Sequence, residues 1–180
     1  MGRYFTVEVI PTITASKQHV GAFSNGDVLF DWLSFQIPRG ASKLHTITAI
    51  LRSQDGDHQT TPKIDFYFAK AITGTAPSTL GVINAGVTGF PVLANHLLGM
   101  VHMDTGEFGM NAGESFTIGT SGSGGAVNNA PDLILEDDIN QSAFNTFYIA
   151  GVAGNGINFG TTVLARGGAT ANGSLAVVET

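Results

Sequence analysis

The sequence has no cysteine among its 180 residues, and only 12% of the chain is charged. The absence of thiols excludes disulfide bonds and thiolate metal sites. The charged fraction is roughly half the usual share of about 25%, so there are too few Lys and Glu residues to coat exposed helices. No run of about 18 apolar residues occurs, and the sequence therefore predicts no membrane-spanning helix and no membrane partner.

Positive charge is also scarce, with 8 Lys and Arg residues against 14 acidic residues and a net charge of −6. Nonspecific nucleic-acid binding depends on neutralising phosphates with clustered basic side chains. No stretch brings more than two basic residues close together, so we expect no nucleic-acid partner. The first residues alternate between polar and apolar instead of forming an apolar block, which predicts no secretory signal and synthesis in the cytoplasm.

Glycine is abundant, at 24 residues, which is nearly twice the average share of about 7%. Small residues and low charge suit strands joined by tight turns. They also suit a protein that buries surface against neighbouring copies, because interface cores are depleted in charge. We therefore expect a homo-oligomer, while a compact monomer with a Ser, Thr and Asn surface remains the alternative.

Period-two alternation is the main structural signal, and it begins near the start of the chain. Phe5, Val7 and Val9 share one face of a strand over 4–13, and polar residues separate them. Pro11 predicts that this strand lies at a sheet edge, where a missing N–H does least harm.

The next strand, over 28–37, is apolar on both faces. Leu33, Phe35 and Ile37 fall on one face, and Phe30 and Trp32 fall on the other. This pattern predicts a strand covered at least partly on both sides. Trp32 is the only tryptophan, and core packing is the role that its apolar strand favours over an exposed sugar-stacking platform.

Further strands are predicted between turn signals. The strands over 44–52 and 64–68 flank a polar Asp-Gly loop and are interpreted as a hairpin. The remaining strands are expected at 96–103, 114–119, 133–135, 146–152, 158–164 and 174–178. Residues 77–80 could open a short helical turn. No amphipathic helix pattern and no repeat of fixed period occurs. The sequence therefore predicts one all-β domain over 1–180, an antiparallel two-sheet sandwich, jelly-roll-like, with about 8–10 strands.

Catalytic and cofactor motifs are missing. The segment 119–123 (GTSGS) lacks the last glycine of a Gly-x-Ser-x-Gly elbow, and 154–160 does not fit a dinucleotide loop. We predict no catalytic residue and no cofactor.

Metal ligands are sparse. His96, His102 and Asp104 would share a strand face but span roughly 20 Å, too far for one ion, which leaves His102 and Asp104 as two possible ligands. The acidic segments 55–57 and 136–138 are better explained as solvated turns than as a Ca²⁺ site, although Ca²⁺ at the sheet ends stays open. We predict no metal site.

Four segments carry a resemblance to a known group of proteins: 32–38 (WLSFQIP), 44–51 (LHTITAIL), 55–57 (DGD) and 64–68 (IDFYF). Together with the character of 146–180, they resemble small virion structural proteins of tailed marine bacteriophages. The resemblance implies a non-enzymatic β-sandwich that decorates and cements the capsid in the virion. Its implied partners are the major capsid protein or other virion proteins, and its implied state is a small homo-oligomer, taken as a trimer, made in the host bacterial cytoplasm.

Under that hypothesis the contacts lie on the edge strand or in the apolar segment 81–100. The residues expected to form them are Phe5, Val7, Val9, Phe90, Leu93 and Leu97. The first alternative is a tail, neck or fibre component of the same particle. The second is a carbohydrate-binding β-sandwich module, which requires an exposed aromatic platform. An enzyme would require a pocket with convergent polar groups.

Overall fold

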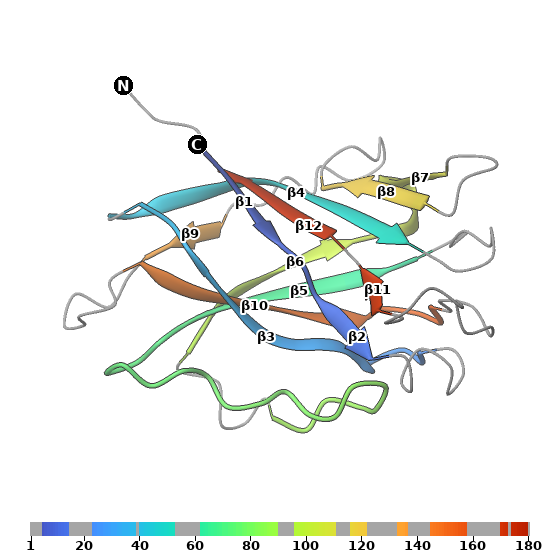
Figure 1. Cartoon of the computed structure of the whole chain (residues 1–180), viewed down its shortest axis with the longest axis horizontal. Helices are drawn as coiled ribbons and strands as arrows, with labels where there is room; N and C mark the ends of the chain where they lie inside the picture. Colours follow the sequence, from blue (N-terminus) through green and yellow to red (C-terminus); the bar gives the residue numbers. More distant parts are fainter. Residues whose placement is uncertain are drawn as a thin grey trace.

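The computed structural model consists of two antiparallel β-sheets packed face to face, which confirms the predicted all-β sandwich (Figure 1). It describes residues 5–14, 23–38, 40–52, 62–89, 96–110, 116–121, 133–136, 145–157, 170–172 and 174–179. In this part of the chain, no helix is long and apolar enough to cross a membrane.

The strands fall into three sheets. The six-stranded sheet has the order β1 (Phe5–Val9), β12 (Ser174–Glu179), β4 (Ser42–Arg52), β8 (Phe116–Thr120) and β7 (Phe108–Met110), with β9 (Leu133–Leu135) also paired to β4. The four-stranded sheet has the order β3 (Val28–Gln36), β10 (Thr146–Ala153), β5 (Ile64–Lys70) and β6 (Leu97–Met103). A small two-stranded sheet joins β2 (Thr12–Thr14) to β11 (Thr170–Asn172). The 3-10 turn η1 (Thr105–Glu107) precedes β7.

The connectivity is that of a jelly roll. The four shortest strands, β2, β7, β9 and β11, have three residues each. The other eight strands can be numbered from one to eight in chain order. In the six-stranded sheet their order is then 1-8-3-6 (β1, β12, β4, β8), and in the four-stranded sheet it is 2-7-4-5 (β3, β10, β5, β6). This arrangement of two interlocked Greek keys places the first and last strands, β1 and β12, side by side.

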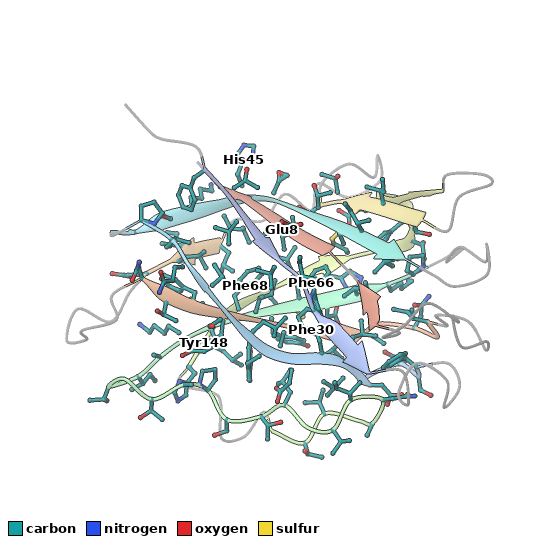
Figure 2. All side chains as sticks on the ribbon, viewed as in Figure 1. Glu8, Phe30, His45, Phe66, Phe68 and Tyr148 are labelled. Carbon is teal, nitrogen blue, oxygen red and sulfur yellow. The ribbon has the colours of Figure 1, made fainter. Side chains whose placement is uncertain are left out.

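Aromatic side chains fill the space between the two sheets. Figure 2 shows Phe66 and Phe68 of β5 in this layer. Phe35 packs edge-on against Phe68, with ring centroids 6.3 Å apart, and lies 6.0 Å from Phe147 of β10. All four rings are almost completely buried. Offset and edge-to-face contacts of this kind add to the free energy gained from burying the ring surface.

The expected strands at 96–103, 133–135, 146–152 and 174–178 are confirmed as β6, β9, β10 and β12. The expected hairpin of 44–52 with 64–68 is wrong. β4 pairs with β12, β8 and β9, whereas β5 pairs with β10 and β6, so the chain crosses from one sheet to the other between them. The expected strand at 158–164 lies outside the described residues.

The prediction that Phe30 and Trp32 share a face of β3 is also wrong. The β3–β10 register shifts twice, between the pairs that include Leu33, Phe30 and Val28, so β3 carries extra residues relative to its partner. A β-bulge changes which face later side chains occupy. Phe30 therefore joins the core between the sheets, where its ring centroid lies 6.5 Å from that of Phe66. Trp32 lies on the outer face.

Residues 77–80 form no helix, so the expected helical turn is wrong. The 3-10 turn η1 is reinforced by a capping box. The Asp104 carboxylate accepts from the Thr105 N–H at 2.7 Å, and the Glu107 carboxylate accepts from the Asp104 N–H at 2.9 Å.

Candidate interaction surfaces

Strand β1 carries three of the residues predicted to form contacts. Val9 is buried, and Phe5 and Val7 are half-buried against the core between the sheets. Thr6 and Glu8 point the other way and are exposed. The side chains of β1 thus alternate between the core and the outer face. Its backbone forms an edge of the sheet, because β12 is its one strand partner among the described residues.

The other predicted contact residues lie in or near the segment 81–100. Phe90 and Leu93 fall outside the described residues. Leu97, at the start of β6, is half-buried and packs against a second apolar cluster on the outer face of the four-stranded sheet. The structure therefore does not bring Leu97 together with β1, which belongs to the other sheet.

The outer face of the four-stranded sheet is covered by residues 76–89, which we call the cover segment. Figure 1 shows it running in green beneath β3 and β10. Leu80 of the cover segment is fully buried in the second cluster, and Val87 packs at its margin. The sheet residues in this cluster are Val28, Trp32, Tyr67, Leu97, Ala150 and Val152.

Polar contacts fix the cover segment to β3. The Trp32 Nε1–H donates to the Ser78 carbonyl oxygen at 2.8 Å, and the Leu80 N–H donates to Asp31 Oδ1 at 2.9 Å. The Val28 N–H donates to the Ala85 carbonyl oxygen, and the Val28 carbonyl oxygen accepts from the Asn84 N–H, each at 2.9 Å. Trp32 therefore packs outside the core between the sheets, and its indole is engaged by the cover segment.

The outer face of the six-stranded sheet has no such cover among the described residues; we call it the uncovered face. Thr46, Thr48 and Ile50 point outward from β4, while the residues between them are buried. Thr48 and Thr120 of β8 face each other with their hydroxyl oxygens 3.3 Å apart. The alternation of residues along 44–52 was visible in the sequence, but the exposure of this side was not.

Large apolar side chains extend the uncovered face. Ile118 of β8 is 40% exposed, and Ile134 of β9 is 58% exposed. The strands of this sheet carry four charged residues, Glu8, Lys43, Arg52 and Glu179, and exposed His45 lies near the Lys43 end (Figure 2). A face dominated by Thr and Ile is stiff, because β-branched side chains have restricted χ1 rotamers.

A polar pair lies on the outer face of the four-stranded sheet, beside the second cluster. Asp65 of β5 and His102 of β6 are register partners, and the Asp65 carboxylate contacts the His102 Nδ1. Burial raises the pKa of the neighbouring Tyr67 hydroxyl, and the negative charge of Asp65 raises it further.

The second carboxylate near this pair is held by a lysine. Lys63 Nζ lies 2.9 Å from Asp104 Oδ1. The hydrogen bond from Lys63, followed by that from the Thr105 N–H, lowers the pKa of Asp104. Both partners are at the surface, so this is a solvent-exposed ion pair of modest energy.

The three residues considered as metal ligands have other contacts. His102 is paired with Asp65, Asp104 is paired with Lys63, and His96 Nδ1 lies 2.9 Å from the Lys70 carbonyl oxygen. Within the described residues, no three His, Cys, Asp or Glu side chains are grouped to hold an ion. The acidic segment 55–57 and residues 137–138 fall outside them, and Glu136 is exposed.

Ser121, in the segment compared with a nucleophile elbow, is buried and hydrogen-bonds to the backbone of β4. Its hydroxyl oxygen accepts from the Ile47 N–H at 2.8 Å, and its own N–H donates to the Ile47 carbonyl oxygen at 2.9 Å. The side chain therefore completes the β4–β8 pairing where β8 ends.

No protein-family model and no curated protein matches the chain. Two solved structures with some similarity are a serine protease of Aeromonas sobria and the complex of that protease with its chaperone. The identities are 8% and 7%, and the TM-scores are 0.33 and 0.32. The matches cover 100% and 99% of this chain but only 28% and 27% of the protease chains. TM-scores this low do not establish a shared fold or activity.

Proposed function

We propose that the protein is a structural component of a bacteriophage particle, a capsid decoration protein that binds the head shell through its uncovered face. The observation that carries the proposal is that a segment of the chain covers one outer face of the sandwich, whereas the described residues leave the other outer face exposed. The four-stranded sheet is closed by the cover segment, with Leu80 fully buried beneath it. The six-stranded sheet presents Thr48, Ile118 and Ile134 with no equivalent cover in the described part of the chain.

The chemistry of the uncovered face supports binding to a protein surface. Its β-branched side chains lose little rotamer entropy on contact, and their methyl groups gain from being removed from water. The sparse charge keeps the desolvation cost low. A single face of this size binds weakly, but copies that bridge neighbouring shell subunits gain by multivalency.

The fold agrees with the proposal without selecting it. Jelly rolls occur in viral capsid domains, and they also occur in lectins and cupins. The resemblance of 32–38, 44–51 and 64–68 to phage virion proteins favours the capsid role. The proposal assigns no reaction to the protein and no resident cofactor.

The test is co-sedimentation of the purified protein with expanded phage head shells. Ile118→Lys places a charge on the uncovered face, and we expect it to weaken shell binding at least about tenfold, because an apolar contact is replaced by an unpaired buried charge. Val82→Lys is the matched control. Val82 is 62% exposed and lies in the cover segment, on the opposite side of the sandwich.

The outcomes are distinct. Binding lost in Ile118→Lys and kept in Val82→Lys supports the proposal. Equal binding by both variants would move the contact off the uncovered face. Failure of the wild-type protein to bind shells would overturn the capsid role.

The alternative of a tail, neck or fibre component is separated by imaging, because a labelled chain located outside the head would decide for it. A carbohydrate-binding module predicts glycan binding that depends on Trp32, Tyr67 or Tyr148, the aromatic residues of the outer four-stranded face. Trp32 and Tyr67 are already engaged with the second cluster, which makes this face a poor platform.

A further inference from the structure

The outermost strands of the two main sheets, β1, β3, β6, β7 and β9, are protected unequally. An unpaired strand edge invites pairing with another chain, and proteins blunt it with bulges, short strands or covering segments. β3 has an irregular register and is bridged at Val28 to Ile83 and at Asp27 to Gly86. β7 and β9 are only three residues long.

The remaining edges are β6 and β1. β6 lies against β9 of the other sheet, so closely that a Cβ on Gly99 would overlap the side chain of Leu133. β1 also contacts β3 of the other sheet, but it has no bulge, is longer than β7 and has no backbone bridge to a covering segment among the described residues. It is regular over five consecutive pairs with β12, contains no proline or lysine, and is followed by Ile10, which is 52% exposed. Among the described residues, no segment pairs with its outer side.

The sequence of β1 is self-complementary in an antiparallel arrangement. When two copies of FTVEV are centred on Val7, Phe5 of one faces Val9 of the other on the core side. On the outer side, Thr6 faces Glu8 twice, and the two carboxylates do not oppose each other. Pairs of an aromatic and a β-branched side chain are favourable across antiparallel strands. A Thr hydroxyl can also donate a hydrogen bond to a Glu carboxylate.

We propose that β1 pairs antiparallel with β1 of a second copy of this chain, about a two-fold axis at Val7. The contact joins the two six-stranded sheets into one continuous sheet and covers the exposed remainder of Phe5 and Val7. A two-fold contact uses the same residues on both sides, so it closes as a dimer and not as the trimer expected from the resemblance.

A second copy fits this edge better than an unrelated strand. The palindromic pattern of apolar and polar positions satisfies both faces at once, and the only charge, Glu8, finds a hydroxyl partner in that register. The proposal does not depend on the capsid role, because it concerns the free protein in solution.

The test is sedimentation velocity on the full chain at concentrations from about 1 μM to about 1 mM. We expect a monomer–dimer equilibrium. Thr6→Glu places one carboxylate opposite Glu8 in each of the two Thr6–Glu8 contacts, and it should raise the dimer dissociation constant about tenfold. Thr6→Lys should lower it, and Thr6→Glu combined with Glu8→Lys should restore dimerisation through reversed charge pairs.

Thr88→Glu is the control, since Thr88 is exposed in the cover segment and the charge change is identical. A wild-type protein that is monomeric throughout, or trimeric, overturns the proposal. Equal dissociation constants for Thr6→Glu and Thr88→Glu also overturn it. If Thr6→Glu does not fold, as judged by circular dichroism, tighter association of Thr6→Lys supports the contact and unchanged association rejects it.

Discussion

The indole Nε1–H of Trp32 donates a hydrogen bond of 2.8 Å to the carbonyl oxygen of Ser78, which links the middle of β3 to the cover segment. The adjacent Asp31 accepts from the Leu80 N–H. Two neighbouring residues in the bulged part of β3 therefore hold a stretch of chain that has no regular secondary structure. The bulge makes this possible, because it lets adjacent side chains reach the same segment.

Leu80→Ala is expected to loosen the cover segment. The side chain is fully buried, and its truncation should lower the free energy of unfolding by about 2–5 kcal/mol. Trp32 is the only tryptophan, so its fluorescence reports directly on this contact. We expect a red-shifted emission at temperatures where the sandwich is still folded.

Val82→Ala is the control for that experiment, because Val82 lies two residues away and is 62% exposed. Its stability and emission should stay close to those of the wild type. An unchanged spectrum and stability in Leu80→Ala would contradict the packing described for the cover segment.

Gly151→Ala tests the close contact between β10 and β3. Gly151 is the register partner of Phe30, and a Cβ at this position would overlap the Phe30 ring. Phe30 is buried in the core, so the clash should cost about 1–3 kcal/mol in thermal or denaturant unfolding. Gly106→Ala, where a Cβ meets nothing within 4 Å, should be nearly neutral. Equal stability of the two variants would show that the ring can move aside at no cost.

Period-two alternation was sufficient to predict most strands and the sandwich. Ile64, Phe66 and Phe68 face the core as expected, because an uninterrupted strand keeps its alternation. The face of Phe30 could not be predicted, since a bulge inserts a residue without changing the composition of the strand. Nor could the sheets of β4 and β5 be assigned, because a polar Asp-Gly loop serves a hairpin and a crossover equally well.

The candidate surfaces were predicted less completely than the fold. Sequence patterns identified β1 as an edge, but they could not show that its apolar side chains pack inward. The cover segment has no period-two alternation, because the residues that it packs inward, Leu80, Ile83 and Val87, are three and four positions apart. Without the cover, the difference between the two outer faces was not visible in the sequence.

Asp104 provides a pH-dependent contribution to stability. Its pKa is lowered by Lys63 and the Thr105 N–H, so the stabilisation is present above the ordinary Asp pKa of about 3.9 and is lost as the pH falls through the lowered value. Asp104→Asn keeps the capping oxygen but loses the charge. Its deficit in unfolding free energy relative to the wild type should therefore exist at neutral pH and vanish in acid.

Asp104→Ala removes both the charge and the cap, and it should cost about 1 kcal/mol in addition, at all pH values. Thermal melts of the wild type and both variants between neutral pH and the acid limit of folding would measure this. An Asp104→Asn deficit that persists unchanged in acid would contradict the role of the carboxylate charge.

Tyr67 should titrate above its ordinary pKa of 10.0, because burial and then the charge of Asp65 favour the neutral phenol. A raised pKa in the folded state means that the unfolded chain loses this proton at a lower pH than the folded protein. The contribution of Tyr67 to stability is therefore fully present below about pH 10 and falls as the pH rises toward the raised pKa.

Ultraviolet difference titration of the wild type against Tyr67→Phe isolates this one phenol among the three tyrosines. In Asp65→Asn the midpoint should drop only part of the way to the ordinary value, since burial is the larger cause and remains in place. A complete return to 10.0 would make Asp65 the main cause, and a midpoint at or below 10.0 in the wild type would place Tyr67 in water instead of against the second cluster.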